Sequence, residues 1–235
     1  NINFTKKLRY NFFPRPHFTS ADSIIQDGES ITADIKKIII YISLDNLFSS
    51  KNIEVNDVII ENANFNLNKK NYNFFINLMD MNLINSNFKI KKSNIFFRNN
   101  LNEVLFINKV IEMKYYYDTN ELRNILYSTN EIFNLPYDIK LYFDDNKKKI
   151  LTKLNIDYFK LKVENEIDYK KEEKKGQVNF LLNRSKSFSN YIIKKKIFDF
   201  RYFDKLDNPT IEYKGKINFF PFYSSIIGKT EDLDA

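Results

Sequence analysis

Residues 53–67 constrain the fold of this chain more than any other stretch, because their side chains alternate in polarity. The intervening register is mostly Asn or Glu, and the apolar register contains Ile53, Val55, Ile59, Ala63, Phe65 and Leu67. A period of two is typical of a β-strand with one dry face and one wet face. The stretch is about three times as long as a typical strand, so its apolar side needs either a core or a ligand.

Similar segments continue to the end of the chain. We predict strands over residues 17–25, 32–43, 88–98, 103–117, 137–144, 150–154, 158–169, 177–184, 191–202 and 210–218. The links between most of them are short and polar, which favours sequential antiparallel hairpins, a meander. Ser43 and Asn71 are plausible N-caps for short helices over 44–48 and 71–79. Residues 119–130 fit either a helical turn or a loop.

Two further segments each place their apolar residues on one face. Leu105, Ile107, Ile111 and Met113 share one, together with Tyr115 and Tyr117, and Leu161, Val163 and Ile167 share another, together with Phe159 and Tyr169. The fold predicted from these patterns is mainly β: an antiparallel meander that forms an elongated, curved open sheet, a β-groove or half-tube, with one or two short helices in the N-terminal third. The apolar residues named here and in the first paragraph, except Phe159 and the tyrosines, are the candidate lipid-binding set.

The charge of the chain does not by itself identify a partner. The formal net charge of +7 would suit nucleic acid or an anionic lipid surface. Acids and bases are mixed along most segments, however, which is typical of a solvated sheet face. The basic and aromatic run over 191–202 could stack on single-stranded nucleic acid, but its spacing favours a strand edge on a core. We therefore predict no nucleic-acid partner.

The residues that carry chemistry are sparse. The chain has no Cys, which excludes disulfides and thiolate sites. Its one His, His17, is interpreted as a partly exposed strand residue, and one His cannot complete a common zinc site. The paired acids Asp144-Asp145 and Glu172-Glu173 lie in lysine-flanked turns. We predict no catalytic residue, metal or cofactor, and no enzymatic activity.

Four consecutive features resemble the N-terminal region of AsmA-like envelope proteins. They are Arg15-Pro16-His17-Phe18, the strand Ala33 to Ser43, the run Leu44-Asp-Asn-Leu-Phe48 and the strand Ile53 to Asn68. In that family an RPH-like first strand precedes a strand ending in SLxxLF and then a strand of the type I-x-I-x-x-V-x-I-x-x-x-x-F-x-L. Residues 132–137 and 215–222 look like later strand starts in such proteins.

The resemblance implies a location and a role. Such proteins are tethered to the inner membrane of Gram-negative bacteria by an N-terminal helix, and their bulk is periplasmic. They are related to bridge-like lipid transporters with a repeating β-groove. On this basis we expect residues 1–235 to form one AsmA-like domain from a longer protein, with a basic segment, 1–16, following an anchor.

Two functions remain in view at this point. The first is binding or conduction of phospholipid, or another acyl-chain lipid, along an apolar groove, in support of outer-membrane lipid homeostasis and assembly. The second is a periplasmic scaffold whose strands close around a filled β core and contact other envelope proteins. An uncovered apolar face would favour the first, and a filled interior the second.

Overall fold

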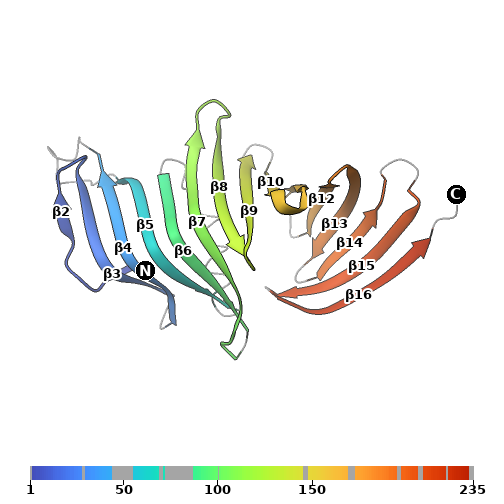
Figure 1. The fold of residues 1–235 in the computed structure, drawn as a ribbon, viewed down its shortest axis with the longest axis horizontal. Helices are drawn as coiled ribbons and strands as arrows, with labels where there is room; N and C mark the ends of the chain where they lie inside the picture. The colour runs from blue at the N-terminus through green and yellow to red at the C-terminus, as the bar shows by residue number, and fades with distance from the viewer. Residues whose placement is uncertain are drawn as a thin grey trace. The chain divides into compact units, whose positions relative to one another are not determined.

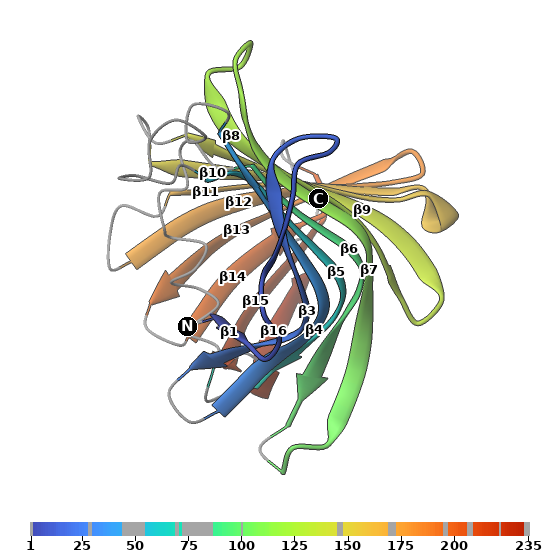
Figure 2. The same ribbon diagram turned by 90° about the vertical axis from the view of Figure 1, so that its left-hand side faces the viewer.

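A computed structural model of the protein describes residues 2–27, 30–43, 55–68, 71, 87–99, 101–144, 148–168, 173–194, 197–205, 209–220 and 222–232. These residues are mainly β, as predicted, and the chain forms two compact units, Asn1–Asn134 and Leu135–Ala235. Figure 1 shows the strands in chain order, and Figure 2 shows the same ribbon after a quarter turn. The expectation of a single domain stays a prediction.

Unit 1 is a mixed sheet whose spatial order is β1-β3-β4-β5-β6-β7-β8, with β2 pairing β3. Its strands are β1 (Ile2–Phe4), β2 (Arg9–Asn11), β3 (His17–Asp27), β4 (Ser30–Ile42), β5 (Val55–Leu67), β6 (Asn87–Arg98), β7 (Val104–Asp118) and β8 (Arg123–Ile132). All pairs are antiparallel except β5 and β6, which run parallel. This pair departs from the predicted meander, because parallel neighbours need a long crossover, here residues 68–86.

Unit 2 is an antiparallel meander in which each strand pairs with the next. Its strands are β9 (Leu135–Asp144), β10 (Lys149–Ile156), β11 (Leu161–Asp168), β12 (Glu173–Leu182), β13 (Ser185–Lys194), β14 (Ile197–Phe203), β15 (Ile211–Phe220) and β16 (Phe222–Asp232). A 3-10 turn, Asp157–Phe159, joins β10 to β11. In both units the described strands form an open sheet, since no pairing joins the first strand to the last.

Several sequence predictions need correction. Residues 119–130 are neither a helix nor a loop throughout. The Asp118 side chain accepts hydrogen bonds from the backbone amides of Asn120 and Glu121 in a turn, and β8 begins at Arg123. The single strand predicted over 191–202 is two strands, β13 and β14. Strand β16 was not predicted. The helices expected over 44–48 and 71–79 lie outside the described residues, apart from Asn71.

Turns are built largely without glycine, as the scarcity of Gly predicts. Asn102, Asn134, Lys148, Lys160 and Asn183 adopt positive φ angles between 51° and 67°. Asn tolerates this left-handed conformation better than most residues, because its short side chain bonds locally. Phe133 and Leu122 also have positive φ values in turns, where bulky side chains are disfavoured.

A row of irregular residues crosses the sheet of unit 1. Asp22 on β3, Asn62 on β5 and Lys92 on β6 have φ angles of 50°, 55° and 48°. The register places Lys36 of β4 between Asp22 and Asn62, and Ile111 of β7 opposite Lys92. The pairing of β7 with β8 shifts at the same level, between Val110 and Glu112. We call these five residues, Asp22, Lys36, Asn62, Lys92 and Ile111, the reversal row.

The reversal row inverts the alternation of each strand that it crosses. On β5, Val58 and Ile60 face the core before Asn62, and Ala63 and Phe65 face it afterwards. A non-extended residue within a strand moves the following side chains to the opposite face, as a one-residue slip would. The core of unit 1 therefore combines even-numbered and odd-numbered residues, among them Ala33, Ile35, Ile38, Ile60, Ala63, Phe65, Ile90 and Val110.

A buried serine replaces hydrogen bonds that the ladder lacks beside this row. The Ala63 N–H donates to the Ser93 Oγ at 3.0 Å, and that hydroxyl donates to the Lys91 carbonyl at 2.8 Å. Ser93 is 2% exposed, so water cannot easily take over either bond. Buried backbone groups need a partner, and the side chain supplies it where β5 and β6 separate.

Ser93→Ala is expected to destabilise the protein by about 1–3 kcal/mol, because it leaves the buried Ala63 amide without an acceptor. Urea unfolding followed by circular dichroism measures the change. The neighbouring Asn94→Ala is the control: it removes an exposed side-chain bond to Asn64, and we expect a loss below about 0.5 kcal/mol. Equal losses for the two variants would contradict this role of Ser93.

Candidate apolar binding surface

The strands of unit 2 gather their apolar side chains on one face. Residues directly opposite each other in antiparallel pairs share a face, and one such row joins Ile139, Leu154, Val163 and Phe180 across β9 to β12. The aromatic residues of β13 and β14 continue the same face through their register. We define the apolar face of unit 2 as Ile139, Leu141, Phe143, Ile150, Leu154, Leu161, Val163, Ile167, Val178, Phe180, Tyr191, Phe198, Phe200 and Tyr202.

The aliphatic members of this face remain partly exposed. In the described part of unit 2 no aliphatic side chain is buried, whereas Ile35 and Val110 of unit 1 are each 1% exposed. The apolar face of unit 2 thus leaves hydrocarbon in contact with water. Each methylene that a ligand removes from water contributes about 0.8 kcal/mol, so the face is suited to bind an apolar ligand.

The opposite face of unit 2 carries ion pairs between neighbouring strands. Lys153 on β10 lies 3.0 Å from Glu164 on β11, and Lys149 pairs with Glu166. The hydrogen bond to Glu166 raises the pKa of Lys149. Such exposed pairs contribute little to stability, but they keep this face in water. The described ion pairs of unit 2 therefore lie on one face only, although Leu151, Phe188 and Phe203 share that face with them.

A further ion pair joins β14 to β15 on the charged face. The Arg201 guanidinium hydrogen-bonds both carboxylate oxygens of Glu212, whose side chain is 3% exposed. Bidentate pairing of this kind is the strongest arrangement for an arginine and a carboxylate. The pKa of Glu212 is lowered, first by the hydrogen bond from Arg201 and then by Lys214. Strands β14 and β15 are thereby tied together on the side away from the apolar face.

Tyr191 lies flat on the apolar face rather than standing out from it. A Cβ atom at Gly176 would be 2.2 Å from the Tyr191 Cζ, which shows that the ring covers this glycine on the adjacent strand. The Tyr191 hydroxyl then reaches β11 and donates to the Asn165 Oδ1 at 2.7 Å. Burial raises the pKa of Tyr191. The ring thus provides a smooth apolar surface and gives Asn165, a polar residue on this face, a partner.

The same arrangement recurs two strands further along. The Phe200 ring covers Gly215, where a Cβ atom would lie 2.5 Å from its Cζ. Phe200 also contacts Tyr213, with 5.6 Å between ring centroids, and Tyr191 stacks on Phe198 at 4.8 Å. Glycines opposite aromatic residues are a recognised way to pack a ring against a sheet. The rings of β13 to β15 therefore form a continuous aromatic floor.

The predicted lipid-binding residues do not form one surface. Leu161, Val163 and Ile167 lie together on the apolar face of unit 2. Ala63 and Phe65 are buried in the core of unit 1, Met113 packs against that core, and Leu67 is half-buried. Ile53 lies outside the described residues.

The remaining predicted residues of unit 1 lie on the side away from its core. Val55, Leu105, Ile107 and Ile111 are between 40% and 49% exposed, and Ile59 pairs with Ile39 on the same side. The shared faces predicted for β5 and β7 are therefore wrong, because the reversal row inverts the alternation at Asn62 and at Ile111.

The sequence reasoning missed most of the apolar face of unit 2. Ile139, Leu154 and Phe180 complete the row of Val163, yet no face was assigned to their strands. The alternation of Tyr137, Ile139, Leu141 and Phe143 is visible in the sequence and could have identified β9. Residues 191–202 do not form the single strand edge that their spacing predicts, because β13 ends at Lys194 and the antiparallel β14 begins at Ile197.

The described residues that were considered for catalysis or metal binding contact other groups of the sheet. His17 is buried rather than partly exposed: its Nδ1 lies 2.7 Å from the Arg15 carbonyl and its ring 5.1 Å from that of Tyr41. Glu173 pairs with Lys175 and Lys194, whereas Asp145 and Glu172 lie outside the described residues. The described ranges contain no cluster of three or more possible metal ligands.

The comparisons with protein-family models and with curated sequences gave no relative. No protein-family model matches the chain, and no curated protein matches its sequence. In the part of the chain that the structure describes, no helix is long and apolar enough to cross a membrane.

We expect Gly176→Ala to destabilise the protein by about 1–3 kcal/mol, because the added methyl group must displace the Tyr191 ring. A double-mutant cycle with Tyr191→Ala tests this cause through urea unfolding. In the Tyr191→Ala background the cost of Gly176→Ala should fall to nearly zero. An unchanged cost would show that the ring is not what requires glycine at this position.

Proposed function

We propose that the protein is a non-enzymatic lipid-binding module that holds the acyl chain of a phospholipid on the apolar face of unit 2. The observation that supports this is the pairing of a partly exposed apolar face with an ion-paired opposite face in one sheet. In this proposal the sheet of unit 2 is an open groove whose floor includes the flat rings of Tyr191 and Phe200.

The dimensions of the face suit an acyl chain. The apolar face of unit 2 runs from β9 to β14, and five spacings of about 4.8 Å give roughly 24 Å across the strands. That exceeds the ~15 Å of half a bilayer's hydrocarbon core. A chain lying across the strands meets similar residues at each step, Ile139, Leu154, Val163 and Phe180 in turn. Similar contacts at each step favour sliding along the face over trapping at one point.

The proposed setting follows from the resemblance to AsmA-like proteins. We propose a periplasmic location, with an N-terminal tether to the inner membrane of a Gram-negative bacterium and possible contacts to other envelope proteins. Moving or holding phospholipid there would contribute to outer-membrane lipid homeostasis and assembly. This setting depends on the resemblance alone.

The scaffold alternative draws support from unit 1. Its core is filled, with Ala33 and Ala63 at 0% exposure and Ile38 at 1%. A filled core offers no room for a ligand at that level of the sheet. In the proposal, unit 1 therefore has a supporting role and unit 2 binds the lipid.

Adjacent residues on β11 allow a direct test, because the chain has no cysteine of its own. Val163→Cys and Glu164→Cys each accept an environment-sensitive fluorophore, and they lie on opposite faces. On addition of phospholipid vesicles, we expect a blue shift in emission at position 163 and none at position 164. No shift at position 163, together with no phospholipid detected by mass spectrometry of the purified protein, would refute acyl-chain binding.

A charge introduced on the apolar face should block binding. Val178→Glu is expected to reduce phospholipid uptake by tenfold or more, on the order of 1.4 kcal/mol, because burying a carboxylate against hydrocarbon is costly. Asn179→Glu adds the same charge on the opposite face and should bind normally. The measurement is transfer of a fluorescent phospholipid, with circular dichroism to confirm that both variants fold. Equal uptake by the two variants would contradict the assignment of the apolar face.

A further inference from the structure

The hairpin between β2 and β3 carries exposed aromatic side chains at its tip. Phe13 is 82% exposed and Phe12 57%, and their ring centroids are 6.2 Å apart. Leu8 and Tyr10, just before them, are also exposed. Large apolar side chains grouped at a loop tip are unusual unless they meet a partner or a membrane.

The same segment is strongly basic. Lys6, Lys7, Arg9 and Arg15 precede the first acidic residue of the chain, Asp22. Arg9 lies three residues from Phe12, about 10 Å along an extended strand, which is close to one Debye length at physiological salt. Arg9 is therefore near enough to act together with the aromatic tip on an anionic surface, and Lys6 and Lys7 lie further along the same segment.

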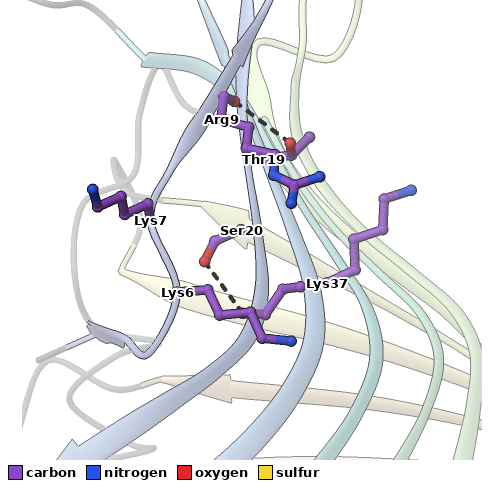
Figure 3. A pocket seen from close by; sticks show the side chains of 7 residues that line it. Lys6, Lys7, Arg9, Thr19, Ser20 and Lys37 are labelled. Carbon is purple, nitrogen blue, oxygen red and sulfur yellow. Dashed lines mark hydrogen bonds between the residues drawn. The ribbon is translucent and has the colours of Figure 1, made fainter.

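A basic pocket lies beside this hairpin. It has a volume of about 460 Å³ and is lined by Lys6, Lys7, Arg9, Thr19, Ser20, Ala21 and Lys37. Figure 3 shows Lys6, Lys7 and Arg9 on the segment that passes β3, and Lys37 on the other side of β3. The pocket lies where β3 has no edge partner, between its pairing with β1 and its pairing with β2.

Two of the pocket cations have no acidic partner within the described ranges. Lys6 pairs with Asp22, and Lys37 pairs with Glu61 at 3.0 Å. No ion pair to Lys7 or Arg9 is formed by the described residues. These two side chains can therefore meet an external anion without first breaking an ion pair.

Arg15 ties the end of the hairpin loop to the sheet. Its guanidinium lies 2.8 Å from the Asp57 carboxylate on β5 and 4.4 Å from the ring centroid of Tyr41 on β4. With the loop anchored there, the aromatic tip needs little ordering when it binds, and a smaller loss of entropy leaves more net affinity.

We propose that the β2–β3 hairpin docks on an anionic phospholipid bilayer, with Phe12 and Phe13 entering the interface and the basic pocket holding lipid phosphates. Exposed aromatics beside cations without acidic partners match this surface, since interfacial binding combines apolar burial with attraction to anionic lipid. Docking goes beyond acyl-chain binding on unit 2 and does not rest on it.

Vesicle co-sedimentation of the full chain tests the aromatic part. We compare vesicles of phosphatidylcholine alone with vesicles that also contain phosphatidylglycerol, and expect binding to the second kind. Phe12→Ser/Phe13→Ser should weaken it tenfold or more, on the order of the effect of removing two buried aromatic rings. Tyr158→Ser/Phe159→Ser removes another adjacent, exposed aromatic pair and should not change it. Equal behaviour of the two variants overturns the proposal.

A second pair of variants tests the basic part. Lys7→Gln/Arg9→Gln should weaken binding to the anionic vesicles about 25-fold, since each basic side chain near such a surface contributes roughly fivefold. Arg184→Gln/Lys186→Gln makes the same change in net charge at exposed positions of unit 2 and should have little effect. If both variants lose affinity equally, net charge alone explains binding, and the proposed pocket is wrong.

The two proposals fail in different experiments. Loss of vesicle docking with the emission shift at Val163→Cys retained overturns only the docking site. Docking that persists without that shift refutes acyl-chain binding and supports the docking site. A third outcome is that inorganic phosphate at millimolar concentration produces saturable chemical-shift changes at Arg9 and Lys7 in nuclear magnetic resonance, while vesicles of either kind fail to bind. In that case the pocket binds a soluble anion, and bilayer docking is wrong.

Discussion

The hydrogen-bond ladder between neighbouring strands assigns every side chain to one of two faces, and both units depend on that constraint. In unit 2 the ladder is regular from β9 to β14, so the ion pairs lie on one face, together with a few apolar residues such as Leu151 and Phe188, and the opposite face is mainly apolar. In unit 1 the reversal row interrupts the ladder, so within a strand the residues that face the core are even-numbered on one side of the row and odd-numbered on the other. The difference between a filled core and an open apolar face begins with the register of the backbone.

Side chains fill two gaps in the sheets: one where a backbone amide lacks a partner on the next strand, and one where a glycine has no Cβ atom. Ser93 provides both an acceptor and a donor beside the reversal row. Tyr191 fills the space above Gly176 and provides a hydrogen-bond donor to Asn165. In each case a polar atom that the fold would leave unsatisfied gains a partner. Ser93 satisfies the backbone beside the reversal row, and the Tyr191 ring covers the gap above Gly176 on the apolar face.

The sequence was sufficient to predict the class of fold and most strands, because alternation and short polar links are local signals. It was insufficient to predict the faces of β5 and β7, because Asn62 and Ile111 carry no mark of a reversal: Asn is abundant in this chain, and Ile favours strands. The parallel pairing of β5 with β6 was equally hidden, since it depends on a contact between segments separated by residues 68–86.

Part of the candidate site was open to prediction and part was not. The alternation over Leu161, Val163 and Ile167 correctly placed three residues on one face. The aromatic floor required the knowledge that Tyr191 and Phe200 lie opposite Gly176 and Gly215, which is a matter of pairing between strands. Spacing within one strand contains no information about its neighbour.

The reversal row also bears on how such a sheet can change over time. Removing the single residue Asn62 would restore plain alternation and leave Ala63 and Phe65 facing the core, because Ala63 would then follow Ile60 at a spacing of two. Inserting one residue at this level, or an extended conformation of Asn62 at constant length, would instead exchange Ala63 and Phe65 with their polar neighbours without altering strand order. Insertions at these five positions therefore offer a route from a packed interior to an exposed apolar surface.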